Sequence, residues 1–275
     1  MIALDMVWDP SKGLDLGFFT LHYYSVMWIL AFIIGLQIMK RIYKNEGQGE
    51  ASLDSLFIYA VIGIMLGARL GHVIFYQPEL IREDFFSIFL PFKFKGGFEF
   101  TGFQGLASHG AAIAMIISMY IYNKKVLHKT VLWILDRVVI PVASGAVFVR
   151  LGNFINSEII GKPTGSDFGV VFKDLGENFP RHPAQLYEAG SYIFVFLALW
   201  YFYWKTKKSE QQGFLFGLFL VMLWSIRFFV EFVKEPQGDE YFTLFGLNTG
   251  QMLSIPFVLI GLYFMFIYKP KTKLS

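Results

Sequence analysis

Hydrophobic residues in this chain gather into runs of about 20, and the segments between them hold most of the charged residues, glycine and proline. A helix of that length crosses a hydrocarbon core of roughly 30 Å. The pattern predicts an all-α polytopic membrane protein. Its seven predicted transmembrane helices lie at residues 17–39, 53–77, 102–122, 131–151, 186–204, 213–233 and 247–268.

Three connections between these runs are long and lack the apolar length of a membrane helix. Residues 78–101 contain FKFKGGFEF, in which apolar and polar residues alternate as in a short hairpin. Residues 152–185 are rich in glycine, proline and asparagine, and residues 235–246 follow the sixth run. We expect a small extracytoplasmic head built from these loops on one membrane domain spanning residues 1–275. Ordinary connecting loops are the alternative.

Composition agrees with a membrane protein, since 55% of the residues are hydrophobic and only 16% are charged. The net charge of +3 is too small to indicate nucleic acid as a partner. The chain has no cysteine, which removes disulfides, thiolate metal sites and a cysteine nucleophile together. Any thiol chemistry would therefore use the sulfur of a substrate.

Lysine and arginine are unevenly divided between the two sets of connections. The connections after runs 1, 3 and 5 and the carboxyl-terminal segment hold twelve: Lys40, Arg41, Lys44, Lys124, Lys125, Lys129, Lys205, Lys207, Lys208, Lys269, Lys271 and Lys273. The opposite connections and the amino-terminal segment hold eight: Lys12, Arg82, Lys93, Lys95, Lys162, Lys173, Arg181 and Lys234. Because positive charge favours the cytoplasmic side, we expect the amino terminus outside and the carboxyl terminus inside.

The other four arginines lie within the apolar runs, where a charge is costly and normally has a partner. Arg137, beside Asp136 near the inner end of run 4, is expected to form an interfacial ion pair. With the predicted orientation, the other three fall in the outer half of the membrane, together with polar residues of other runs. The residues of this predicted layer are Arg69, Arg150, Arg227, Glu231, His109, Tyr24 and Tyr187.

Each of these residues also has a purely structural explanation. The two tyrosines are compatible with an aromatic belt, and His109 with helix packing. Arg69, inside the small-residue sequence GIMLGARLG, is compatible with snorkelling, and Arg227 with a structural ion pair to Glu231. Their common depth nevertheless favours a shared site.

Arginines near the outer headgroups predict a site for an anion, because a guanidinium donates two parallel hydrogen bonds to phosphate. The segment RLGNFINSEIIG adds Asn153, Asn156 and Glu158, around a turn that we expect Gly152 and Gly161 to permit. A phospholipid headgroup is the anion present at that depth. A neutral histidine nearby is a candidate general base.

Two functional classes fit such a layer: an enzyme acting on a lipid headgroup, or a transporter or channel for an anionic solute or lipid. Transporters often contain inverted repeats with broken helices at the midplane. The sequence shows no such repeat, and its polar layer lies away from the midplane. The pattern therefore favours the enzyme, without naming its reaction.

The segment RLGNFINSEIIG, residues 150–161, resembles the signature of the prolipoprotein diacylglyceryl transferase family. Further blocks with the same resemblance follow in order along the chain: HYYSVMW around Tyr24, GARLGHVIFY around Arg69, SHG at His109, RHPAQLYEA from Arg181, IRFFVEFVKEP with Arg227 and Glu231, and NTGQMLS from Asn248. The resemblance covers nearly the whole chain.

The resemblance implies transfer of the diacylglyceryl group of phosphatidylglycerol to the lipobox cysteine thiol of a prolipoprotein, with release of glycerol phosphate. This is the first step of bacterial lipoprotein maturation. It further implies a seven-helix protein of the bacterial cytoplasmic (inner) membrane, with its active site towards the outer leaflet and no metal or cofactor. The expected partners are phosphatidylglycerol, prolipoprotein signal peptides with a lipobox cysteine, and membrane lipid.

The resemblance also implies residue roles. Arg150 and Arg227 would hold the phosphate and stabilise the departing glycerol phosphate, and His109 would be the base for the thiol. The expected binding and supporting residues are Tyr24, Arg69, Asn153, Asn156, Glu158, Gly161, His182, Gln185, Tyr187 and Glu231. One departure is that Ala111 and Ala114 stand where the family usually has glycine, which affects the expected packing beside His109.

Overall fold

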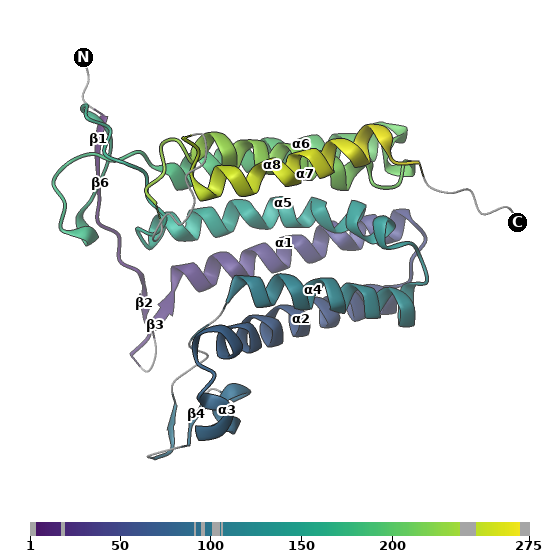
Figure 1. The fold of residues 1–275 in the computed structure, drawn as a ribbon, viewed down its shortest axis with the longest axis horizontal. Coiled ribbons are helices and arrows are strands. Elements are labelled where there is room, and N and C mark those ends of the chain that lie inside the picture. Colours follow the sequence, from purple (N-terminus) through teal and green to yellow (C-terminus); the bar gives the residue numbers. More distant parts are fainter. Residues whose placement is uncertain are drawn as a thin grey trace, which may run out of the picture. The chain divides into compact units, whose positions relative to one another are not determined.

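A computed structural model of the chain describes residues 4–17, 20–90, 92–94, 97–100, 105, 107–236 and 246–269. The chain, drawn as a ribbon in Figure 1, divides into two compact units. Unit 1 comprises Met1–Met39 and Leu135–Ser275, and unit 2 comprises Lys40–Ile134. Each unit is described by itself below.

Helices dominate both units, as the hydrophobic pattern predicts. A helix fills most of each predicted run: α1 (Tyr23–Asn45), α2 (Glu50–Tyr76), α4 (Ser108–Tyr122), α5 (Val131–Ile155), α6 (Ala184–Lys205), α7 (Phe214–Val230) and α8 (Thr249–Leu262). By length and composition, α1, α2, α5 and α8 with its π-helical extension (Tyr263–Ile267) can each cross a membrane, and α7 is a shorter apolar helix. The helical class is confirmed, and seven membrane crossings stay a prediction.

The first helix differs from its predicted range of 17–39, because α1 runs from Tyr23 to Asn45. The preceding residues form a two-stranded hairpin, in which β2 (Gly13–Asp15) pairs with β3 (Thr20–His22). At its other end, α1 continues beyond the apolar run through Lys40 and Arg41. A helix can continue in a polar environment, so the end of an apolar run does not fix the end of the helix.

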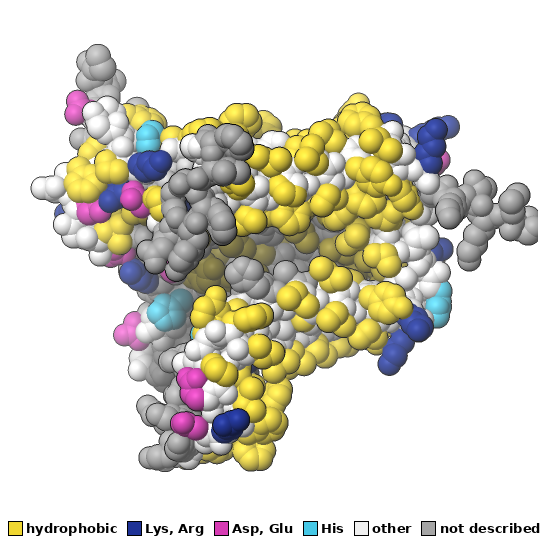
Figure 2. Space-filling model, viewed as in Figure 1, with side chains coloured by type: hydrophobic (Ala, Val, Ile, Leu, Met, Phe, Trp, Pro, Cys, Tyr) yellow, Lys and Arg dark blue, Asp and Glu magenta, His cyan; other side chains and the backbone are white. Residues whose placement is uncertain are grey.

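The flanks of the helices carry exposed apolar side chains (Figure 2), among them Ile116 on α4 and Phe194 on α6, which are 71% and 70% exposed. Lysine and arginine gather at helix ends in the same view. An apolar surface of this extent is unfavourable in water and suits contact with lipid.

Glycines bring α2 and α4 of unit 2 into close contact. A Cβ added at Gly71 would lie 2.6 Å from the Cα of Gly110, and one added at Gly63 would lie 2.8 Å from the Cβ of Ser118. Gly67 packs against Gly110 and Ala114, so one of the two unusual alanines lies in this interface. The predicted small-residue face of GIMLGARLG is confirmed.

The segment after α2 contains more structure than the predicted hairpin. A short helix, α3 (Leu80–Glu83), and a 3-10 turn (Phe85–Ile88) come first. The strands β4 (Phe92–Lys93) and β5 (Glu99–Phe100) then pair antiparallel, as the alternation in FKFKGGFEF predicts. The short helices have no comparable sequence pattern.

A layer of five extended segments, here called the β layer, lies at the end of unit 1 where α5 ends. Its longest strands, β1 (Leu4–Trp8) and β6 (Phe168–Phe172), pair in parallel. Arg181 pairs with Val170 of β6, and Gly161 and Lys162 exchange hydrogen bonds with His182. The fifth segment follows α7, where Val233 accepts from Lys162 N–H and Glu235 donates to Ile160. The predicted head segment 152–185 thus forms most of the β layer, and the amino-terminal strand adds to it.

A small hydrophobic core joins the β layer to the helices. Phe154 of α5 and Val170 and Phe172 of β6 are buried together, and Trp8, Ile160 and Leu186 pack against them. This core fixes the β layer beside the last turn of α5. Of the predicted head segment 235–246, residues 237–245 lie outside the described part of the chain.

At its other end, α5 is joined to α7 by Asp136. The fully buried carboxylate accepts hydrogen bonds from the N–H groups of Gly213 (2.7 Å) and Phe216 (2.9 Å), and so caps the start of α7. Arg137 lies 4.0 Å from Asp136 and donates to the carbonyl of Ser209. The expected pair is present, but Asp136 has the additional role of holding α7 against α5.

The contact between α2 and α4 gives a stability prediction. We expect Gly71→Ala to lower the free energy of unfolding by about 1–3 kcal/mol, because the added methyl group overlaps the backbone of α4. Thermal denaturation in detergent measures the change. Gly190→Ala on α6 is the matched control, since a Cβ there meets nothing within 4 Å. Equal stability of the two variants would contradict the close contact.

Candidate active site

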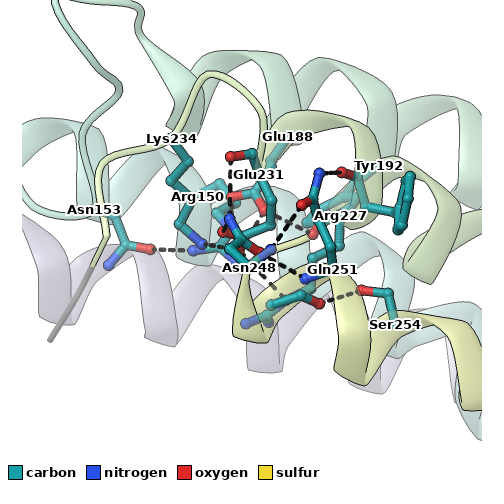
Figure 3. Close-up of polar contacts among 12 residues, drawn as sticks. Arg150, Asn153, Glu188, Tyr192, Arg227, Glu231, Lys234, Asn248, Gln251 and Ser254 are labelled. Carbon is teal, nitrogen blue, oxygen red and sulfur yellow. Dashed lines mark hydrogen bonds and ion pairs between the residues drawn. The ribbon is translucent and has the colours of Figure 1, made fainter. Parts of the chain in front are cut away.

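Arg150, near the end of α5, forms a buried ion pair with Glu188 of α6 (Figure 3). Its Nε lies 2.7 Å from Glu188 Oε2, and its Nη2 donates to Glu188 Oε1 at 3.3 Å. Glu188 has no exposed surface. The carboxylate therefore occupies one side of the guanidinium and holds it in a single orientation.

The third donor group of Arg150, Nη1, contacts the Asn153 amide oxygen at 3.3 Å. Asn153 in turn donates to one carboxylate oxygen of Glu158 at 3.4 Å, and Asn156 donates to the other at 3.1 Å. Gln185 donates to the Glu158 carbonyl at 2.6 Å. The polar residues of RLGNFINSEIIG thus form one connected network around Arg150.

The turn after α5 is not built as the sequence suggests. Ser157 and Ile159 have positive φ angles, of 55° and 57°. Gly152 lies within α5, and Gly161 does not have a positive φ angle. The two glycines permit close approach instead. A Cβ on Gly152 would lie 2.7 Å from the Tyr24 ring, and one on Gly161 would lie 2.6 Å from the Cβ of His182. Tyr24 is thereby packed on α5 at Gly152.

Arg227 lies in the last turn of α7, beside a second polar group. Glu231 is 3.8 Å from Arg227 Nε but only 2.9 Å from the Nζ of Lys234. Asn248 Nδ2 also donates to Glu231, at 3.4 Å. Asn248 and Gln251 then form a capping box at the start of α8. Glu231 is therefore the centre of a contact between α7 and α8, rather than a tight partner of Arg227 alone.

Arg227 keeps unused hydrogen-bond donors. Its buried Nε has no hydrogen-bond acceptor within the described residues, and its side chain remains 35% exposed. Trp224 lies beneath the guanidinium, with its ring centroid 5.4 Å from Cζ. The group is held in place by a ring and a distant carboxylate, so its donors are available to an anion.

Tyr192 of α6 connects the two arginine groups. Its hydroxyl donates to Glu188 at 3.5 Å and accepts a hydrogen bond from Arg150, and it also interacts electrostatically with Arg227. Figure 3 shows the residues of the two groups facing one region between α5, α6, α7 and α8. The arrangement can bind an anionic group between two guanidinium ions.

Two predicted site residues belong to unit 2. Arg69 donates to the carbonyls of Ser87 (2.9 Å), Ile88 (3.1 Å) and Gly105 (3.4 Å), and so fastens the segment after α2. His109 is the second residue of α4, and its side chain lies outside the described part of the chain.

The remaining predicted residues lie where the β layer meets α6. His182 Nδ1 is 3.2 Å from the Tyr187 hydroxyl. Beside it, Arg181 binds Glu177 through Nε (2.5 Å) and Nη2 (2.6 Å) and reaches Glu235 at 2.9 Å. The hydrogen bond with Glu177 raises the pKa of Arg181 above its usual range. Arg181 therefore stays charged and links its own segment of the β layer to Glu177 and to Glu235 of the segment 233–235.

Sequence reasoning missed two members of the site, Glu188 and Lys234. Glu188 is the only charged residue in the predicted run 186–204, so the need for a buried partner could have identified it. The sequence places Lys234 among the cations of the loops, yet it is only 4% exposed. Its burial depends on a bridge to Gly161 that no local pattern indicates.

Comparison with known proteins identifies the family. The family model for prolipoprotein diacylglyceryl transferase matches residues 12–267. The chain belongs to this family. A relative from Bacteroides fragilis, named phosphatidylglycerol–prolipoprotein diacylglyceryl transferase, is 40% identical over 98% of both chains. Relatives with the same name from Tolumonas auensis (41% identical, 94% of this chain and 96% of the relative) and Chloroherpeton thalassium (38%, 94% and 92%) are similarly close.

Membership of the prolipoprotein diacylglyceryl transferase family confirms the resemblance seen in RLGNFINSEIIG. The family and the apolar helices together mark the chain as a bacterial membrane protein. Among the residues that the structure describes, no group of three or more histidines or carboxylates could hold a metal ion. The polar site of this family member is instead built from paired arginines and carboxylates.

The buried pair of Arg150 and Glu188 gives a prediction for stability. We expect Glu188→Ala to lower the free energy of unfolding by about 3–5 kcal/mol, since it leaves a buried cation without its partner. Thermal denaturation of Glu188→Ala, Arg150→Ala and the double variant forms a double-mutant cycle. The double variant should be more stable than the sum of the single changes predicts. Additive effects would show that the two side chains do not interact.

Proposed function

We propose that the protein transfers the diacylglyceryl group of phosphatidylglycerol to the lipobox cysteine thiol of a prolipoprotein. Family membership and the names of the relatives support this reaction. The observation that carries it is the convergence of Arg150 and Arg227 near Tyr192, with the buried Nε of Arg227 lacking an acceptor within the described residues. The transporter alternative has no comparable support in the fold.

The two arginines act on the phosphate of the donor lipid. Glu188 and Asn153 fix the guanidinium of Arg150 through Nε, Nη2 and Nη1, and a phosphate oxygen would compete with Asn153 and Tyr192 for its Nη groups. Arg227 contributes its unused donors from the other side. As the bond between the glyceryl carbon and the phosphate oxygen breaks, negative charge grows on the departing glycerol phosphate. Fixed cations stabilise that charge most strongly in the transition state.

The acceptor sulfur forms the new carbon–sulfur bond, and its proton must pass to a base. His109 is the proposed base, as the family resemblance implies. Tyr24, Asn153, Asn156, Glu158 and Gly161 support Arg150 and the turn after it, and Glu231 supports Arg227. Arg69 contributes indirectly, by holding the segment after α2.

The proposed setting is the cytoplasmic membrane, with seven helices crossing it and the β layer on the outer side. The uneven distribution of lysine and arginine supports an outer amino terminus and a cytoplasmic carboxyl terminus. In that orientation the ends of α5 and α7 that carry Arg150 and Arg227 lie near the outer headgroups. The donor lipid would then reach the site laterally from the bilayer.

Loss of an arginine tests the phosphate site. Purified protein in micelles containing phosphatidylglycerol should convert a lipobox peptide to its diacylglyceryl form, measured by mass spectrometry. We expect Arg227→Gln to lower the rate about 10²–10³-fold, as when one donor to a developing anion is removed. Arg82→Gln, an exposed arginine on α3, is the control and should keep full activity.

Full activity of Arg150→Gln and Arg227→Gln would sink the proposed clamp while leaving the reaction itself untouched. The transporter alternative instead predicts solute flux in proteoliposomes without any lipidated product. Measurement of both flux and product in one preparation separates the two classes.

The proposed base has its own test. If His109 accepts the thiol proton, His109→Gln should lower kcat about 10²–10⁴-fold at neutral pH. Raising the pH should partly restore the rate, because more of the peptide thiol is then ionised without a base. A small loss that does not depend on pH would assign His109 a packing role.

Orientation can be tested with single cysteines, since the natural chain has none. In intact spheroplasts, a membrane-impermeant maleimide should label Lys12→Cys and leave Lys124→Cys unlabelled. After lysis both positions should react, which controls for accessibility. The opposite pattern would reverse the proposed topology.

A further inference from the structure

The β layer of unit 1 has one open edge. Its segments follow in the order 233–235, 160–164, 180–182, β6 and β1, joined by the hydrogen bonds described above. Among the described residues, β1 pairs with β6 alone. Alternate residues of a parallel strand direct their N–H and C=O groups away from the paired neighbour. The outer side of β1 therefore carries backbone groups available to another strand.

The two edges of the β layer differ in their protection. At one edge, the segment 233–235 is followed immediately by Pro236, which has no N–H and stops further pairing. At the other edge, β1 has the sequence LDMVW, without proline or lysine. Its Met6 and Val7 side chains are 47% and 54% exposed. Natural edge strands usually carry charges or proline that prevent pairing, and β1 has a single charged residue, Asp5, so its outer edge can accept a further strand.

The open edge ends beside the active site. The indole Nε1 of Trp8, the last residue of β1, donates to the carbonyl of Phe154 at 3.0 Å. The two rings are in contact, with their centroids 4.4 Å apart. Phe154 directly follows Asn153, whose amide oxygen accepts from Arg150. A polypeptide lying along β1 would therefore lead to the arginine that binds the donor phosphate.

We propose that the outer edge of β1 binds the prolipoprotein as an added strand and thereby delivers its cysteine to Arg150. The inference rests on the proposed function, which requires a polypeptide acceptor. An extended polypeptide is the occupant whose chemistry fits a row of backbone donors and acceptors. Pairing through the backbone supplies affinity that does not depend on the side chains of the acceptor.

Backbone methylation of the acceptor gives the first test. A series of lipobox peptides carries one N-methyl group at each of five successive residues beside the cysteine, to match the five residues of β1. Strand pairing uses the N–H groups of alternate residues. We expect KM for the peptide to rise roughly three- to tenfold at every second position and to stay unchanged between them. Equal KM values at all positions would overturn the proposal.

The same peptides distinguish failure of the proposed function from failure of the β1 binding site. If wild-type protein lipidates none of the peptides, including the unmethylated one, the proposed function fails. If it lipidates every peptide with one KM, the function stands and the β1 site fails. An alternating KM with unchanged kcat supports both.

Disulfide crosslinking locates the peptide on the protein. Val7→Cys introduces a single cysteine on the open edge, and Lys162→Cys, also exposed but on an inner segment of the β layer, is the matched control. Each is mixed with peptides whose lipobox cysteine is serine and whose one cysteine is moved along the chain. Crosslinking to Val7→Cys should alternate with a period of two, because strand side chains alternate between faces.

Two results would overturn the proposed peptide site. Equal crosslinking of Val7→Cys and Lys162→Cys would show that the peptide has no preferred position on the β layer. A Val7→Cys homodimer that forms efficiently and excludes the peptide would show that a second copy of the chain occupies the edge.

Discussion

Arg150 is held at one side by a carboxylate with no exposed surface, and much of unit 1 is arranged to keep that pair in place. Removing both charges from water costs several kcal/mol per ion, so neither residue would be stable there alone. Glu188 balances the charge and contacts the guanidinium from one side only, through Nε and Nη2. The pair thus has two effects. It stabilises a cation between apolar helices, and it fixes the direction in which that cation can bind an anion.

Contacts at both ends of the helices set the position of Arg227 relative to this pair. At one end, Asp136 caps α7 and ties it to α5, the helix that carries Arg150. At the other, Glu231 joins Lys234 and Asn248, so the last turn of α7 is fixed to the start of α8. A Cβ on Gly250 would lie 2.6 Å from the Glu231 carboxyl carbon, and close packing therefore holds that carboxylate. Of the two arginines, Arg227 has the weaker carboxylate contact, at 3.8 Å from Glu231, and therefore the more available hydrogen-bond donors.

The helices and both arginines could be predicted from the sequence because each has a strong signal. A run of about 20 apolar residues has few alternatives to a membrane helix, and an arginine within one demands a function or a partner. The β layer gave no such signal, since its segments are short and pair across long distances in the chain. Ser157 and Ile159 adopt the positive φ angles expected of Gly152 and Gly161, because both glycines are needed for close packing instead.

The two substrates of the proposed reaction come from different phases, and unit 1 contains a structure suited to each. Apolar helices surround the arginines, so a lipid can approach them without leaving the bilayer. The β layer, by contrast, exposes backbone groups that an extended polypeptide can pair with in water. Trp8 and Phe154 join the two parts through one hydrogen bond and one ring contact. The placement of Phe154 directly after Asn153 means that an acceptor held by β1 and a phosphate held by Arg150 would meet at the end of α5.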